Sequence, residues 1–301
     1  IRAVRFAAKL SPLGFKLEPK TAGPLVKSQK LLHDVPQSRL FDEMLKLLQT
    51  GHALASIAQL KELGLATGIY PLLDVVVERA GQSFVEAALK DTDRRVGEGK
   101  PVAPSFLLAC VLWDDVRKGW DQRLARGEHS HPALQDAIED VFNARIGDVS
   151  GRGKLAGDMR EIWLMQPRFD KRVGSTPFGM AEQPRFRAAF DFMRLRADAG
   201  EVDEVLADWW QEFSMASDDV RQDMVDQVRA EQQQQRKQAP KGPRVAKQPR
   251  EPRATDAAPS GLAEVALQGA ADTGGDAPRK RKRRRRSNAS RGAGSAGTAA
   301  E

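Results

Sequence analysis

The sequence predicts an all-α protein that ends in a disordered basic tail, and three observations lead to this prediction. Apolar residues in 1–235 recur at spacings of three and four, which is typical of helices with one buried face. Runs of Val, Ile and Thr, which favour strands, are scarce in the same region. Residues 236–301 contain no aromatic residue and few large aliphatic residues, so they cannot bury enough apolar surface to offset the entropy lost on ordering.

The helical period is clearest in segments 37–48 and 53–64. Pro36 precedes the first segment and Gly51 follows it, as expected at the two ends of a helix. Gly64 ends the second segment in the same way. The apolar face expected for the first helix consists of Leu40, Met44 and Leu48, with Phe41 and Leu45 beside them.

The same pattern predicts further helices over 83–94, 103–126, 132–147, 154–165, 184–199, 202–214 and 218–236. Glycine and proline mark loops between them, at 97–101, 147–151 and 174–177. A break near Gly81 divides the helical region, and the composition changes again after the glutamines at 232–235. We therefore expect three segments, 1–78, 79–235 and 236–301.

The basic residues are concentrated in the tail. Residues 236–301 hold 16 of the 48 Lys+Arg and only 6 of the 41 Asp+Glu, so the preceding residues carry a small acidic excess. Eight adjacent cations repel one another unless a polyanion neutralises them, and nucleic acid is the cytoplasmic polyanion we favour as partner. An anionic membrane surface or a merely solubilising role are the alternatives. The eight consecutive cations are Arg279, Lys280, Arg281, Lys282, Arg283, Arg284, Arg285 and Arg286.

A second basic region lies in the helical part, over 167–187. The tail has no aromatic side chain on which a base could stack, and phosphate contacts alone do not specify sequence, so discrimination must come from the helical body. The three phenylalanines of this region fit two interpretations, surfaces for single strands or core. The region's candidate RNA-binding residues are Arg168, Arg172, Arg185 and Arg187, with Lys171 beside them; the phenylalanines are Phe169, Phe178 and Phe186.

No pattern in the sequence predicts a catalytic or metal site. Cys110 lies in an apolar helical stretch, which predicts a buried and unreactive thiol. Asp114 and Asp115 diverge by about 100° on a helix, which favours a solvated face over a metal clamp. His129 and His131 lie in a polar loop without the further ligands that a zinc site needs. Phosphate-binding loops of the G-x-x-x-x-G-K-[ST] and G-x-G-x-x-G types are also missing from the sequence.

The composition also bears on the compartment. One Cys among 301 residues offers no disulfide within the chain, and no apolar run approaches the eighteen or so residues that a membrane span needs. The first residues have no signal-peptide pattern, and the first of them is not Met. We therefore expect a fragment of a cytoplasmic protein with no integral membrane association.

Several stretches resemble a known family. The opening residues 1–10, IRAVRFAAKL, resemble the end of the signature D-P-x-R-x-L-R-A-x-R-F-A-A-K-L, which lies where head meets neck in bacterial poly(A) polymerases and the related tRNA CCA-adding enzymes. Four later stretches resemble the poly(A) polymerases in particular: 35–48, 101–109, 162–169 and 184–192. The arginine-rich carboxyl tail is similar to that family as well.

This resemblance implies a helical neck over 1–78 that contacts RNA and the head, a helical body over 79–235 and a flexible basic tail. It also implies that the catalytic carboxylates and the residues that select ATP precede this chain, so no catalytic or metal-binding residue is carried over. Arg2 and Arg5 belong to the signature and are expected to brace the neck against the head. The complete enzyme would use ATP and Mg to add AMP to RNA 3′ ends, whereas this chain alone is expected to be inactive.

The implied partners are single-stranded RNA 3′ ends, the preceding catalytic head and the RNA-decay machinery. Three alternatives stay open at this point. The chain could be a fragment of a CCA-adding enzyme, which would share the opening motif. It could instead be a non-catalytic RNA-binding adaptor, or a helical protein-interaction domain whose tail binds membrane surfaces.

Overall fold

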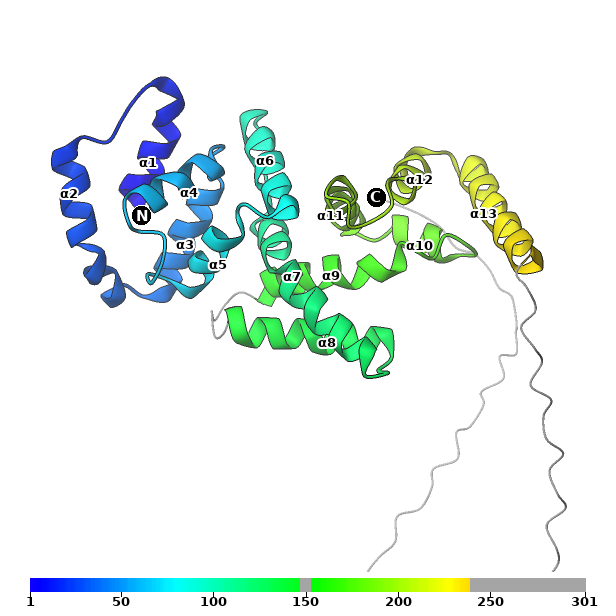
Figure 1. The fold of residues 1–301 in the computed structure, drawn as a ribbon. Coiled ribbons are helices and arrows are strands. Elements are labelled where there is room, and N and C mark those ends of the chain that lie inside the picture. The colour runs from blue at the N-terminus through cyan, green and yellow to red at the C-terminus, as the bar shows by residue number, and fades with distance from the viewer. Residues whose placement is uncertain (147–152, 239–301) are drawn as a thin grey trace, which may run out of the picture. The chain divides into compact units, whose positions relative to one another are not determined.

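The computed structural model describes residues 1–146 and 153–238, and every regular element in those ranges is helical (Figure 1). The predicted all-α class is therefore confirmed for the helical region. Residues 239–301, which make up nearly all of the predicted tail, lie outside the described residues. The predicted loop at 147–151 also lies outside them. None of the described helices is long and apolar enough to cross a membrane.

Five helices form the amino-terminal part: α1 Arg2–Leu10, α2 Pro19–Lys27, α3 Gln37–Leu48, α4 Ala53–Glu62 and α5 Pro71–Arg79. Short 3₁₀ turns, Ser11–Leu13 and Gln29–Asp34, flank α2. The predicted helix over 37–48 is confirmed, and its buried residues are Leu40, Phe41, Met44, Leu47 and Leu48. Leu45 is only partly buried and packs against the edge of the core.

The end of α4 shows how the sequence stops a helix. Gly64 has a φ of 65°, a left-handed conformation that glycine adopts without steric cost. The Leu65 amide then donates to the Leu60 carbonyl at 2.8 Å, and the Gly64 amide donates to the Lys61 carbonyl at 3.1 Å. These two bonds are the pair that defines a Schellman motif. The predicted stop at Gly64 is confirmed.

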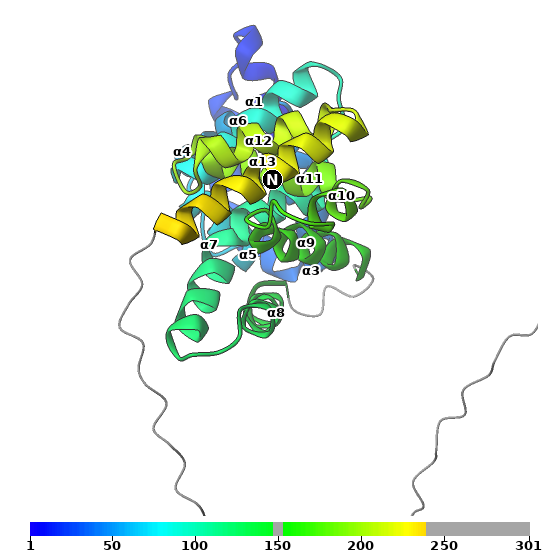
Figure 2. The same cartoon turned by 90° about the vertical axis from the view of Figure 1, so that its right-hand side faces the viewer.

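Eight helices form the rest of the described chain: α6 Ser83–Gly97, α7 Pro104–Ala125, α8 Ser130–Val141, α9 Gly153–Met165, α10 Thr176–Ala181, α11 Phe186–Asp198, α12 Glu204–Met215 and α13 Asp218–Gln238. A 3₁₀ turn, Gln166–Arg168, follows α9. The seven helices predicted in this region are all present, with ends shifted by a few residues. α7 and α8 lie side by side in both views (Figures 1 and 2).

Two elements differ from the prediction. The helix expected over 132–147 starts at Ser130 and continues after Val141 as a π-helix, Phe142–Ile146. The sequence predicts a loop at 174–177, but the last two residues of this segment begin α10, Thr176–Ala181. Pro177 stands in the first turn of α10, where its missing N–H costs no hydrogen bond.

The larger core cluster runs from α1 to α11 and includes residues on both sides of Gly81. Phe192 of α11 is fully buried in it, and its ring centroid lies 5.1 Å from that of Phe84 of α6 and 5.5 Å from that of Trp113 of α7, both edge to face. Such aromatic pairs add about 0.5–1.5 kcal/mol each beyond the area they bury. The three rings pack α6, α7 and α11 against one another. The division into segments 1–78 and 79–235 stays a prediction.

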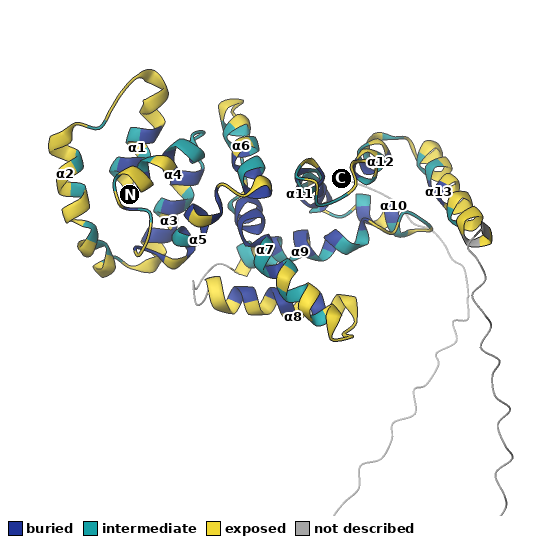
Figure 3. Cartoon of the chain, viewed as in Figure 1, coloured by how far each residue is buried: buried dark blue, intermediate teal, exposed yellow. Residues whose placement is uncertain are grey.

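A second cluster joins α10, α11, α12 and the first half of α13. Trp210 is fully buried in it, and its Nε1 donates to the Phe169 carbonyl at 2.8 Å, so its one polar atom has a partner. Among the α13 residues whose burial the structure describes, only Val225 and Val228 are buried, and most of the others are exposed (Figure 3). The buried contact between α13 and the rest of the helical region is therefore confined to a narrow stripe of the helix.

Candidate nucleic-acid interface

A groove of about 250 Å³ lies where α6, the start of α7 and α11 meet. Its apolar lining residues include Val102, Ala103 and Phe106. Three arginines and two aspartates also line it: Arg95, Arg185, Arg187, Asp91 and Asp191. A lining that combines apolar and cationic side chains suits a ligand that is both flat and anionic, such as an unpaired nucleotide.

Arg95 is the best-fixed cation of this groove. Its Nε lies 2.7 Å from Oδ2 of Asp91 and its Nη2 lies 2.8 Å from Oδ2 of Asp191, so it links α6 to α11. Burial opposes the charge of this guanidinium, but the hydrogen bonds to the two carboxylates outweigh that effect and raise its pKa. Arg95 positions α11 relative to α6 and has little freedom to bind a ligand.

Arg187 is the freest cation of the groove. Its side chain is 68% exposed, and its Nε contacts Oδ1 of Asp191 at 3.0 Å, on a carboxylate already shared with Arg95. Its guanidinium also lies 5.7 Å from the ring centre of Phe190. A phosphate could replace the shared Asp191 contact at low cost, because an exposed ion pair of this kind is worth only about 0–1 kcal/mol.

Arg185 points toward α9 as well as the groove. Its Nη2 lies 2.5 Å from Oδ1 of Asp158, and Glu161 is a second, more distant partner at 3.7 Å. The predicted pair Arg185 and Arg187 is therefore brought together at one groove, with different degrees of freedom.

The other two predicted arginines lie elsewhere, on the second core cluster. Arg168 hydrogen-bonds the side-chain amide of Gln183. The Arg172 guanidinium lies 5.7 Å from the ring centre of Trp209, and its buried Nε has no partner within the described residues. They do not line the α6–α7–α11 groove, so the four predicted arginines form two groups.

Of the two interpretations of the phenylalanines, the core interpretation is confirmed for Phe169 and Phe186. These rings are 1% and 7% exposed and belong to the second core cluster. Phe178 is only partly buried and packs edge to face against Phe213 at 5.4 Å. Only Phe178 keeps part of its ring available for stacking.

At the amino terminus, Glu43 of α3 forms ion pairs with Arg2 and Arg5 of the opening motif and with Lys46. Arg5 Nη1 lies 2.8 Å from its Oε2, Lys46 Nζ lies 3.2 Å from its Oε1, and Arg2 is 3.8 Å away. Burial alone would raise the pKa of Glu43, but the hydrogen bond from Lys46 and the nearby cations outweigh it and lower the pKa. Arg5 thus pins α1 to α3, whereas the Arg2 side chain is 69% exposed.

The residues set aside as catalytic candidates occupy structural positions, with one correction. Cys110 is buried, as predicted, and burial raises the pKa of its thiol. Asp114 pairs with exposed Lys118 at 2.6 Å, in agreement with a solvated face. The same expectation is wrong for Asp115, whose Oδ1 lies 2.6 Å from Nη2 of buried Arg79, because the helix turn between neighbours directs it toward α5.

The predicted basic octet at 279–286 lies outside the described residues. Arg95 was not predicted as a groove residue, although it stands four residues after Asp91 on one helix face, a spacing that favours an ion pair. Nothing local to Arg95 indicates its second partner, Asp191, which is 96 residues away in the chain. In residues 1–146 and 153–238, no three His, Cys, Asp or Glu side chains are grouped so that they could hold a metal ion.

The fold and the arginine-lined groove define an all-α protein with a candidate nucleic-acid interface. Residues 126–288 match the family model described as "Polymerase A arginine-rich C-terminus", and residues 14–76 match the one described as "Probable RNA and SrmB-binding site of polymerase A". The chain belongs to the bacterial poly(A) polymerase family.

Among its relatives are enzymes named poly(A) polymerase I. That of Salmonella typhi is 34% identical over 236 residues, which cover 76% of this chain and 50% of the relative. That of Escherichia coli O157:H7 is 34% identical over 239 residues, covering 77% and 50%, and that of Haemophilus influenzae is 32% identical over 232 residues, covering 75% and 50%. The chain spans about half the length of these curated relatives.

Proposed function

We propose that this chain is the RNA-binding, carboxyl-side part of a poly(A) polymerase that adds AMP from ATP to RNA 3′ ends. The observation that carries the proposal is the match of two polymerase A models, one for an RNA-binding region at 14–76 and one for an arginine-rich carboxyl terminus at 126–288. The products would serve mRNA polyadenylation, RNA processing and RNA decay in the cytoplasm.

The chemistry of the complete enzyme is in-line attack of an RNA 3′ hydroxyl on the α-phosphate of ATP, with divalent ions such as Mg stabilising the attacking and leaving oxygens. The described residues do not fit that metal site, since they contain no suitable cluster of ligands. We therefore assign this chain no step of bond making or breaking. Its contribution is to hold and orient the RNA strand.

Two kinds of contact would hold the RNA. Arg185 and Arg187, which line the α6–α7–α11 groove, are suited to the backbone of an unpaired nucleotide, with Arg187 the freer of the two. Arg168 and Arg172 would extend the contact along the second core cluster. The octet at 279–286 would add a contact that is indifferent to sequence, because phosphates look alike in every RNA.

The amino-terminal helices are suited to protein partners. Six of the ten exposed large apolar side chains in the described residues lie within residues 6–31: Phe6, Leu10, Leu13, Phe15, Val26 and Leu31. Such a concentration of exposed apolar surface is typical of interaction sites. We propose that this surface, with Arg2 and the Arg5–Glu43 pair, contacts the preceding catalytic head, and that SrmB and the RNA-decay machinery are further partners of this region.

The full-length parent protein provides the test. Incubated with ATP and arbitrary single-stranded RNA, it should add long A tracts. Addition confined to the 3′ ends of tRNA would contradict the proposal and favour a CCA-adding enzyme. Absence of nucleotide addition together with tight RNA binding would favour the non-catalytic adaptor.

A further inference from the structure

Asp191 of α11 is shared by two arginines of the α6–α7–α11 groove. Its Oδ2 lies 2.8 Å from Nη2 of Arg95, and its Oδ1 lies 3.0 Å from Nε of Arg187. The Asp191 side chain is only 13% exposed, so its charge depends on these partners to compensate for the lost contact with water. Both carboxylate oxygens are engaged, but the two arginines hold them unequally.

The contact with Arg95 is the firmer of the two. Asp91 fixes Arg95 a second time, with its Oδ2 2.7 Å from the arginine Nε. Asp91 precedes Arg95 by four residues, which is the more favourable order for an acidic and a basic residue on one helix. The Arg95 side chain is 30% exposed and links α6 to α11. Asp191 keeps a compensating cation as long as this link is intact.

The contact with Arg187 is the weaker one. Arg187 precedes Asp191 by four residues, which is the less favourable order on a helix, and its side chain is 68% exposed. It also stands in the first turn of α11, where the helix dipole disfavours a cation and favours an anion. Within residues 1–146 and 153–238, no other hydrogen bond or ion pair engages its guanidinium. Arg187 can therefore exchange Asp191 for another anion at low cost.

An ionised carboxylate and a phosphate both accept hydrogen bonds, so they compete for the same Nε–H of Arg187. We propose that Asp191 is an internal competitor of the RNA phosphate at Arg187. In the RNA-free chain Asp191 holds Arg187, and when a phosphate takes over that guanidinium Asp191 keeps its contact with Arg95 alone. The inference rests on the proposed function, because the displacing phosphate belongs to the bound RNA. Asp191 thereby lowers the affinity of the groove for RNA, and the strand is released more readily.

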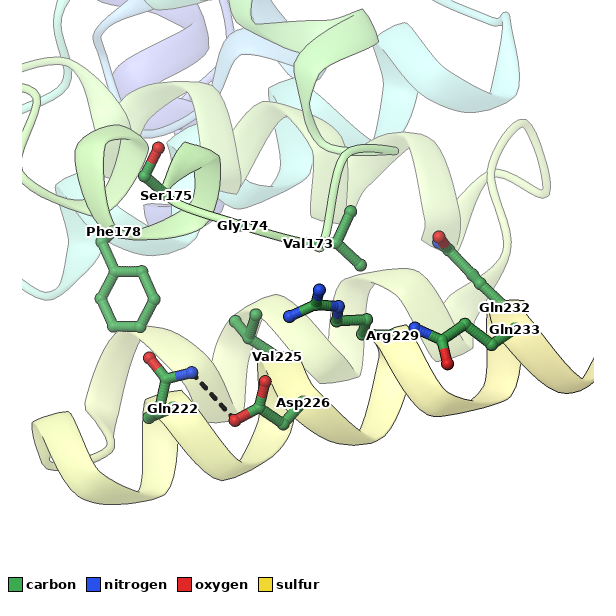
Figure 4. A pocket seen from close by; sticks show the side chains of 10 residues that line it. All are labelled: Val173, Gly174, Ser175, Phe178, Gln222, Val225, Asp226, Arg229, Gln232 and Gln233. Atoms are coloured by element: carbon green, nitrogen blue, oxygen red, sulfur yellow. Dashed lines mark hydrogen bonds between the residues drawn. The ribbon is translucent and has the colours of Figure 1, made fainter.

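An arginine and an aspartate in one groove do not by themselves form such a competitor. A larger groove, of about 780 Å³, lies between α13 and the segment before and within α10 (Figure 4). Arg229 and Asp226 both line it, but Asp226 accepts a hydrogen bond from Nε2 of Gln222 at 3.0 Å. In the part of the chain that the structure describes, no ion pair joins Arg229 to this carboxylate. Of these two grooves, only the α6–α7–α11 groove pairs an arginine with a shared carboxylate.

The pair Arg194 and Asp198 supplies a matched control on the same helix. It repeats the four-residue spacing and the contact between Nε and Oδ1, here at 3.5 Å. Neither residue lines the α6–α7–α11 groove. Asp198→Asn therefore removes one negative charge from α11, as Asp191→Asn does, but leaves the groove unchanged.

The test measures the affinity of the full 301-residue chain for labelled single-stranded U10 by fluorescence anisotropy. Salt is kept at about 0.15 M, where the Debye length is about 8 Å and distant exposed charges are screened. The variants are Asp191→Asn, Asp198→Asn, Arg187→Ala and the double variant Arg187→Ala, Asp191→Asn. Circular dichroism and urea unfolding establish that each variant is folded under these conditions.

Asp191→Asn should bind U10 about two- to fivefold more tightly than the native chain, the range expected when one exposed ion pair no longer competes. Asp198→Asn should leave the affinity unchanged. Without Arg187 the gain from Asp191→Asn should vanish, because the competitor acts only through that arginine. A second measurement uses the native chain labelled with ¹⁵N. The Nε–H resonance of Arg187, identified by its loss in Arg187→Ala, should shift when U10 is added.

Unchanged or weaker binding by Asp191→Asn would overturn the competitor role. An equal gain in Asp198→Asn, or a gain that persists without Arg187, would overturn it in favour of an effect of net charge. An unchanged Arg187 resonance in the U10 complex would overturn it as well, even if Asp191→Asn did not fold. Each of these outcomes leaves the proposed function standing, whereas failure of the native chain to bind U10 would contradict the proposed function itself.

Discussion

Arg79 and Asp115 form a buried ion pair that joins α5 to α7, with Nη2 of the arginine 2.6 Å from Oδ1 of the aspartate. The Arg79 side chain is 8% exposed, and its Nη1 also donates to the Val111 carbonyl at 2.9 Å. Arg145 of the π-helix contacts the second oxygen of Asp115 at 3.0 Å. This one carboxylate therefore holds three separate helical elements together.

Removal of Asp115 is expected to destabilise the fold strongly. Asp115→Ala leaves the buried Arg79 charge without its anionic partner, and such a loss costs about 3–5 kcal/mol. Asp114→Ala on the same helix removes pairs with the more exposed cations Arg117 and Lys118 and should cost about 1 kcal/mol or less. Urea unfolding of the two variants measures both values, and equal losses would contradict this account of the pair.

Trp113 of α7 and Leu45 of α3 differ in burial, so their removal is expected to have different costs. Trp113 is 1% exposed and packs on Phe192, so Trp113→Ala should cost about 3–5 kcal/mol. Leu45 is only partly buried, so Leu45→Ala should cost less, about 2 kcal/mol at most. Denaturant unfolding of both variants gives the comparison; a larger loss for Leu45→Ala would show that the burial of α3 is misassigned.

Asp93 of α6 makes stability depend on pH. Its Oδ1 accepts a hydrogen bond at 2.8 Å from the Ala53 amide, one of the unpaired donors at the start of α4. Burial raises the pKa of this carboxyl, outweighing the backbone hydrogen bonds from Ala53 and Leu54 that lower it. A group of this kind binds more protons when folded, so its stabilising contribution is complete below the unfolded pKa and is lost as pH rises through the folded pKa.

Asp93→Asn keeps an acceptor for the Ala53 amide but cannot ionise. We expect the free energy of unfolding of this variant, relative to the native chain, to increase as pH rises from about 4 to about 7. Thermal unfolding at several pH values follows the difference. A difference that decreases over this interval would mean that the pKa is lowered in the folded state.

The sequence was most informative where a local rule decides the structure. The apolar period predicted α3, α4, α6 to α9 and α11 to α13, and Gly64 ended α4 as glycine does in a Schellman motif. α1, α2 and α5 are only nine residues long each, too short for the period to be clear, and α10 was hidden by the turn-forming residues at its start. Local patterns thus identified the longer helices and missed most of the short ones.

The candidate interface was predictable only in part. Arg185 and Arg187 were identified because they stand in a basic stretch of the sequence. The groove they line depends on contacts between α6 and α11 such as Arg95 to Asp191, and no spacing rule connects residues 96 positions apart. The same limit explains Asp115, whose partner Arg79 lies on another helix.

Arg187, the exposed arginine of the α6–α7–α11 groove, should contribute to RNA binding. Arg187→Ala should weaken single-stranded RNA binding and reduce the slope of log affinity against log salt by about 0.7, the value for one phosphate contact. Arg194→Ala serves as the control, because Arg194 lies on the same helix but pairs with Asp198 and Asp208 away from the groove. An equal loss of affinity in both variants would show that it arises from the lower net charge and not from a contact in the groove.

The octet at 279–286 should act through charge alone. Replacing residues 281–286 by Ala should lower the affinity for every RNA sequence and reduce the salt slope by up to about 4 for single strands. Filter binding over a series of salt concentrations provides the slope. If the slope were unchanged, these six cations would not be contacts to RNA.

We expect both the helical body and the basic tail to bind RNA. Salt titration of single-stranded RNA binding to the full chain and to a version that ends at Arg236 measures the two contributions separately. We predict tight binding with a steep salt slope for the full chain, and weaker but measurable binding with a shallower slope for the shortened one. If neither protein bound RNA, this expectation would be contradicted. Equal affinities of the two proteins would show that the tail does not contribute to RNA binding.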